Sequence, residues 1–120
     1  MAIKLIHDRY RMARGGKSKL VYVICAKCEG KIVLYQKDGP GWLKRCYLNR
    51  IFWPKRYEAL QHDKRIKDPE DMPGLLCPSC RSLIGIPVRH KDGRLAFTLM
   101  RGKFKRVNVK TTHLPDNKIR

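Results

Sequence analysis

The chain has 120 residues, of which 28 are Lys or Arg and 10 are Asp or Glu, so its formal net charge is +18 at pH 7. This length is that of one domain, and self-repulsion between so many cations predicts a polyanionic partner, nucleic acid first of all. A membrane partner is not expected, because the sequence has no run of about 18 apolar residues and no long basic amphipathic helix. A basic protein whose charge serves only solubility is the alternative.

Residues 1–19 are expected to form a basic N-terminal extension that contacts nucleic-acid phosphates. Its candidate contact residues are Arg9, Arg11, Arg14, Lys17 and Lys19. The Gly16-Lys17-Ser18 fragment resembles part of a phosphate-binding loop, but Arg11 stands where the motif requires its first glycine. Nucleotide hydrolysis is therefore not expected.

Residues 20–36 are rich in β-branched and aromatic residues on both sides of Cys25-Ala26-Lys27-Cys28. This composition favours strands over helix, so we expect a hairpin with the two cysteines at its turn.

Residues 41–74 are expected to form a partly helical insert. Basic and aromatic residues alternate near its start. This pattern suits either stacking of the aromatic residues on RNA bases or a segment that turns its apolar residues to the core and its cations to the solvent. The core interpretation is preferred for Leu43, Tyr47, Leu48, Ile51 and Phe52, whereas Trp42 and Trp53 are expected at the surface. The candidate phosphate contacts here are Lys44, Arg45 and Arg50, and Cys46 is expected to be a buried small hydrophobe. Residues 55–67 are expected to be helical, and residues 68–74 an acidic surface loop.

The second cysteine pair, Cys77-Pro78-Ser79-Cys80, precedes a strand pattern over residues 84–88, a turn at Asp92-Gly93 and a returning strand over residues 95–100. Residues 102–120 are expected to form a basic C-terminal strand and tail. We expect Arg101, Lys103, Lys105 and Arg106 to form the main phosphate-binding edge, and a merely solvated charged strand is the alternative.

The two CxxC pairs, 48 residues apart, predict one tetrahedral zinc site with the ligands Cys25, Cys28, Cys77 and Cys80. A thioredoxin-type redox role fits less well, because it would need only one CxxC pair, at the start of a helix. A disulfide framework also fits less well, because the five cysteines are an odd number and there is no secretory signal peptide. Four thiolates leave no open position for a substrate, so the zinc is expected to be structural. The pattern leaves open whether one chain supplies all four ligands or two chains share a site.

Each cysteine pair is followed by a β-rich run and an Asp-Gly turn, and this repeated pattern resembles the zinc-ribbon group over residues 20–40 and 74–101. The resemblance implies two knuckle hairpins that clasp one Zn²⁺ and a role in contacting nucleic acid or protein. The expected fold is therefore a small β-rich α+β domain over residues 20–101, with the insert and the basic extensions added to it.

The expected function is RNA binding as a ribosomal or ribosome-associated protein in a reducing compartment, the cytoplasm. RNA is favoured over DNA because the cations are spread along the whole chain rather than on one recognition helix. The alternative is a zinc-ribbon transcription regulator that binds DNA or RNA polymerase. An enzyme and a small-molecule substrate are not expected, because no catalytic constellation is found.

Overall fold

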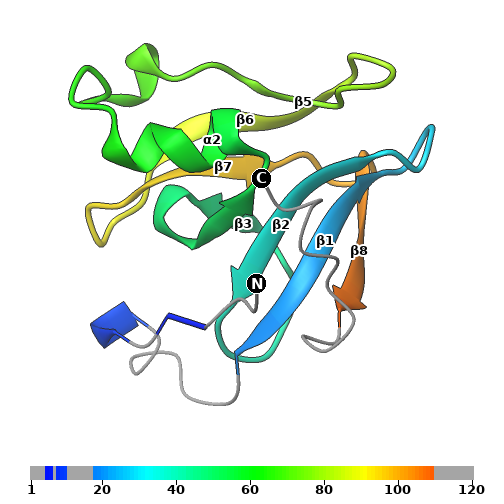
Figure 1. Ribbon diagram of the computed structural model, residues 1–120, viewed down its shortest axis with the longest axis horizontal. Helices are drawn as coiled ribbons and strands as arrows, with labels where there is room; N and C mark the ends of the chain where they lie inside the picture. The colour runs from blue at the N-terminus through cyan, green and yellow to red at the C-terminus, as the bar shows by residue number, and fades with distance from the viewer. Residues whose placement is uncertain (1–4, 7, 11–17, 110–120) are drawn as a thin grey trace.

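The computed structural model describes residues 5–6, 8–10 and 18–109. They form two four-stranded antiparallel sheets and one short α-helix (Figure 1). The strand order is β4-β2-β1-β8 in the first sheet and β3-β7-β6-β5 in the second. The expected small β-rich α+β fold with two CxxC pairs is thus confirmed.

The first sheet is built on the hairpin of β1 (Lys19–Cys25) and β2 (Lys31–Lys37). Both strands are buried over nearly their whole length, which explains their continuous apolar sequence. β8 (Phe104–Val109) pairs with the other side of β1, and β4 (Ile51–Trp53) pairs with β2. The basic C-terminal strand is therefore an edge strand of this sheet.

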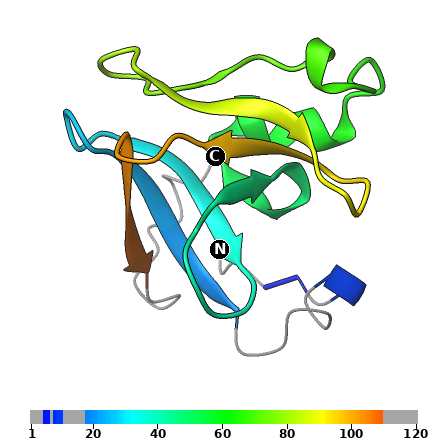
Figure 2. The ribbon, with the colours of Figure 1, turned by 180° about the vertical axis from the view of Figure 1, so that it is seen from behind.

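The second sheet is built on the hairpin of β6 (Leu83–Arg89) and β7 (Leu95–Leu99), which the alternating pattern predicted. β3 (Arg45–Tyr47) pairs with β7, and β5 (Leu75–Leu76) pairs with β6. The α-helix covers one face of this sheet, as the views from both sides show (Figures 1 and 2). The opposite face carries the exposed side chains of Ile86 and Thr98.

The insert contributes one strand to each sheet, because β3 joins the second sheet and β4 the first, with a 3-10 helix, η1 (Leu48–Arg50), between them. The expected helix over residues 55–67 is shorter than predicted. α2 spans only Lys55–Glu58, and the 3-10 helices η2 (Ala59–His62) and η3 (Pro69–Asp71) follow it. The helical path stops at Asp63, whose backbone is extended and whose carboxylate accepts a hydrogen bond from the Arg65 N–H, a local bond that competes with helix.

One hydrophobic core joins both sheets and the helix. Tyr57 of α2 packs edge-on against Phe97 of β7, with ring centroids 5.7 Å apart. Cys46 is fully buried, as expected, and Leu43, Leu48 and Ile51 are also buried, which favours the core interpretation of the insert. Within the part of the chain that the structure describes, no helix has the length and apolar character needed to cross a membrane.

Candidate metal centre and basic groove

The two CxxC segments have the same backbone conformation. In the first, the Cys25 N–H donates to the Gly30 carbonyl and the Glu29 N–H donates to the Cys25 carbonyl, both at 2.9 Å. In the second, the corresponding bonds run from Cys77 to Ser82 and from Arg81 to Cys77, again at 2.9 Å. Glu29 and Arg81 also share a left-handed backbone, with φ of 62° and 65°. The repeat seen in the sequence is therefore a repeat in structure.

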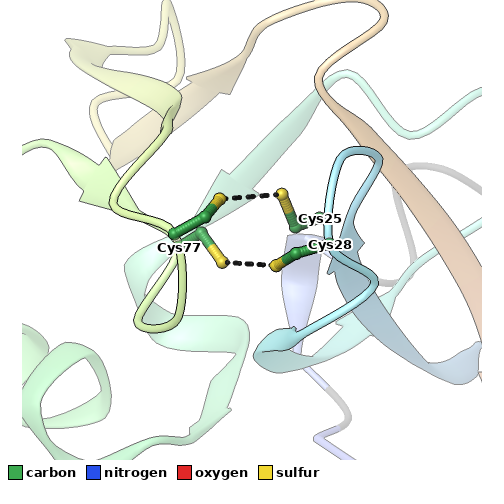
Figure 3. A group of neighbouring side chains, drawn as sticks. Cys25, Cys28 and Cys77 are labelled. Carbon is green, nitrogen blue, oxygen red and sulfur yellow. Dashed lines mark hydrogen bonds between the residues drawn. The ribbon is translucent and has the colours of Figure 1, made fainter.

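The two knuckles come from different sheets and face each other. The first connects β1 to β2 and the second connects β5 to β6, and both project at the same end of the molecule (Figure 1). Figure 3 shows the sulfurs of the two knuckles pointing into the space between them. The Sγ atoms of Cys25 and Cys80 lie 3.6 Å apart, and those of Cys28 and Cys77 lie 3.4 Å apart. One chain thus brings all four cysteines together.

The four sulfurs fit a metal ion. All four Sγ atoms lie within 4.8 Å of one another. A tetrahedral ion with metal–sulfur bonds of about 2.3 Å requires sulfur–sulfur distances of about 3.8 Å. The distances of 3.6 Å and 3.4 Å are near that value, so small movements of the thiols would complete the tetrahedron. This four-cysteine group can hold one metal ion, which would join the two sheets.

The neighbours of Cys28 and Cys80 shift the pKa values of these two thiols in opposite directions. The Ser82 hydroxyl, 3.1 Å from the Cys80 sulfur, is the main reason that the pKa of Cys80 falls to about 6. The Gly30 backbone lowers the pKa of Cys28, but hydrogen bonds with the crowded thiols, that of Cys77 first, raise it to about 11. A metal binds thiolates, so binding at this site releases protons.

A groove on the surface collects five of the cations that the sequence singled out. It has a volume of about 1070 Å³, and two stretches of the chain, residues 41–45 and 98–106, contribute to its lining. The cations are Lys44, Arg45, Arg101, Lys105 and Arg106. No Asp or Glu stands among the residues that line this basic groove in the described part of the chain.

The basic groove lies where the two sheets meet. β8 of the first sheet provides Lys105 and Arg106, and the start of β3 in the second sheet provides Arg45. Arg106 also makes a long hydrogen bond to the Gly41 carbonyl, at 3.4 Å. The shape of the groove therefore depends on the relative position of the sheets.

Trp42 lies at the rim of the basic groove and is 80% exposed. The Arg101 guanidinium lies 6.0 Å from the centre of its ring. A second pocket, of about 340 Å³, shares residues 41–45 with the basic groove. The expectation of a surface tryptophan holds for Trp42, whereas Trp53 is partly buried and packs edge-on against Tyr22.

Arg50 was expected to contact phosphates, and the structure corrects this expectation. Its side chain is only 1% exposed and forms ion pairs with Asp8 and Asp38, the second at 2.8 Å. Burial raises the pKa of Asp38, but hydrogen bonds from Gln36, Ser18 and Arg50 outweigh it and hold the pKa below its ordinary value. Arg50 is thus part of a buried ion network.

Three of the six other predicted contact residues are described by the structure. Arg9, Lys19 and Lys103 are exposed but do not line the basic groove. Arg11, Arg14 and Lys17 lie outside the described residues. The structure therefore does not bring Arg9, Lys19 or Lys103 into the basic groove.

Sequence reasoning missed Arg94, which lines the second pocket. Its guanidinium stacks between two aromatic rings, 3.8 Å from the centre of Tyr10 and 3.7 Å from that of Tyr47. The Asp92-Gly93-Arg94 segment carries a turn signal, and a turn signal does not indicate contacts with residues as distant in sequence as Tyr10 and Tyr47.

In comparisons with known proteins, no family model matches the chain, and no curated protein or solved structure matches it.

Proposed function

We propose that this chain is an RNA-binding protein whose zinc is structural, and that it serves in a large ribonucleoprotein assembly such as the ribosome. The observation that carries the proposal is the basic groove. Five cations from two stretches of the chain that are far apart in sequence converge there without an acidic neighbour among the described lining residues. Such a concentration of positive charge attracts a phosphate backbone and focuses the field on it.

The metal supports this site indirectly. Four thiolates fill the coordination sphere of Zn²⁺, which leaves no position for a substrate or a catalytic water. Because the ligands come from hairpins of both sheets, bound zinc would fix the sheets relative to each other. The proposed role of zinc is therefore to hold the two walls of the basic groove at the spacing that RNA requires.

RNA is favoured over DNA as the partner. The regulator alternative calls for a recognition helix in the insert, and within the described residues the longest α-helix there is the four-residue α2. A groove lined by cations from two distant stretches of the chain suits an RNA that is recognised through its shape and backbone. Contact with RNA polymerase is the remaining alternative.

A matched pair of charge variants tests the proposal. The first variant changes Lys44, Arg101, Lys105 and Arg106 in the basic groove to Gln. The second changes Lys55, Arg56, Lys64 and Lys67, which are exposed elsewhere, to Gln. Both lose four charges, so only their position differs.

Binding is measured with the zinc-loaded protein and a labelled RNA hairpin that has an unpaired loop, at several salt concentrations. The groove variant should bind more weakly, and its salt slope should fall by about 3, since each lost phosphate contact removes roughly 0.7 to 0.9. The second variant should stay close to wild type. Equal losses in the two variants would mean that net charge alone attracts RNA, and the groove would then have no special role.

The assembly is tested with the native protein from its host. We expect it to sediment with a ribosomal subunit after a high-salt wash, with one zinc ion per chain. Recovery with RNA polymerase, or as a free zinc protein, would contradict the ribonucleoprotein proposal.

A further inference from the structure

We propose that the basic groove takes RNA as a single strand, and that an unpaired base stacks on Trp42. This inference rests on the proposed RNA-binding function and adds the form of the RNA to it. It is carried by the exposed indole of Trp42, which lies beside both the basic groove and the second pocket and near the cations of the groove.

Trp42 is presented to the solvent by the backbone that precedes it. Gly39 and Gly41 adopt left-handed conformations, with φ of 76° and 102°, and Pro40 stands between them. Among the described residues Trp42 has the largest exposed fraction of any large hydrophobic side chain, 80%, followed by Ile86 at 48%. An exposed tryptophan contributes little to the core, and its flat apolar surface is what an unstacked base requires.

The cations lie where the backbone of a stacked nucleotide would pass. Arg101 is 6.0 Å from the centre of the Trp42 ring, and Lys105 and Arg106 line the same groove. Lys105 has one acidic neighbour, Glu29, at 4.0 Å, and both side chains are well exposed, so this pair competes weakly with a phosphate. Aromatic stacking beside cations is the usual arrangement in proteins that bind single strands.

The second pocket gives the strand further room. It shares residues 41–45 with the basic groove, so Trp42 stands between two hollows. Its volume of about 340 Å³ lies at the lower end of the range of small-molecule sites, and Tyr47 and Arg94 contribute to its lining. A nucleotide next to the stacked base can therefore turn into it.

A duplex would not use these features. In an A-form helix the bases are stacked on one another, and the accessible groups are phosphates and 2′-hydroxyls. A duplex in the basic groove would contact the cations and leave the indole and the second pocket empty. The structure therefore predicts tighter binding of a single strand than of a duplex of equal length.

Tryptophan fluorescence provides a direct test, because the chain has two tryptophans. Trp53→Phe leaves Trp42 as the reporter. The probes are a single-stranded RNA of about 12 nucleotides, a duplex of the same length, and a strand of the same length with abasic sites in place of its bases. We expect the single strand to quench Trp42 and to bind about ten-fold more tightly than the abasic strand.

Variants at Trp42 complete the test, with every variant first checked for one bound zinc and native circular dichroism. Trp42→Ala should weaken binding of the single strand about ten-fold, leave the abasic strand and the duplex unchanged, and be partly rescued by Trp42→Phe. Leu83→Ala, at an exposed apolar residue outside the basic groove, should change nothing.

Two further outcomes separate this inference from the proposed function. Salt-sensitive binding of the duplex as tight as that of the single strand, with no effect of Trp42→Ala, would overturn the inference and leave the RNA-binding proposal standing. Absence of binding to all three probes at low salt would overturn both.

Discussion

At the scale of single residues, Arg50 shows how the partners of a cation decide its role. Its neighbours in sequence resemble those of the exposed Lys44 and the partly buried Arg45, and local pattern does not separate the three. Its partners are far along the chain, since Asp8 lies 42 positions away and Asp38 lies 12 away. No local periodicity contains that information, so the burial of Arg50 could not be predicted from the sequence.

The substitution Arg50→Met should destabilise the protein. It keeps the volume of the side chain but leaves the carboxylate of Asp38 without its cation in a largely buried site. Breaking a buried ion pair from one side costs about 3 kcal/mol, and exposure of Asp8 keeps the cost at the low end of the known range. The measurement is urea unfolding of the zinc-loaded protein.

Arg65→Met is the control for this experiment, because Arg65 also forms an ion pair, with Asp63, but its side chain is 89% exposed. The free energy of unfolding of this control should stay at the wild-type value. If Arg50→Met were as stable as this control, the buried network would have no structural role.

At the scale of the elements, two hairpins and both knuckles could be predicted because their signals are local. β1–β2 and β6–β7 have strand-like runs separated by a short turn. The backbone conformation of each CxxC knuckle is set by hydrogen bonds between residues that are close in sequence. β3 and β4 could not be predicted. Each has three residues, too few to show a period, and they join different sheets although only η1 separates them. The basic groove depends on β3 and was beyond sequence reasoning for the same reason.

Gly85 in β6 is a point where the packing of the second sheet can be tested. A Cβ at this position would lie 3.2 Å from the Cβ of Phe97, 3.3 Å from that of Leu75 and 3.3 Å from the Thr98 carbonyl oxygen. These atoms belong to rigid parts of β5 and β7, so they cannot rotate away. Gly85→Ala should therefore destabilise the protein by about 1 to 3 kcal/mol through overpacking. The measurement is again urea unfolding.

A suitable control for Gly85→Ala is Thr98→Ala, because Thr98 is an exposed residue of the same sheet and the change removes atoms without crowding. Its unfolding free energy should change far less. An unchanged stability of Gly85→Ala would mean that β5 and β7 have room to separate, which the close packing of this sheet argues against.

At the scale of the whole molecule, the charge and the metal site are linked. The chain carries a net charge of +18, and self-repulsion on this scale opposes compaction. The two sheets share one core, and at their tips the four sulfurs face one another. A metal ion held at that point would contribute its binding free energy to folding, because the site does not exist in the unfolded chain.

Removal of the metal should therefore release RNA together with the fold. We expect a strong zinc chelator to abolish RNA binding and to remove hydrogen-exchange protection from β1, β2, β5 and β6, because the spacing of the groove walls depends on the sheets. Zinc should restore both properties, and Mg²⁺ should not, since it prefers oxygen ligands.

Cys77→Ser should behave like the chelated protein, whereas Cys46→Ala should keep one zinc ion, because Cys46 is buried outside the four-cysteine group. An apo protein that kept both its RNA affinity and its exchange protection would separate the groove from the metal, and the core alone would then have to hold the two sheets in place.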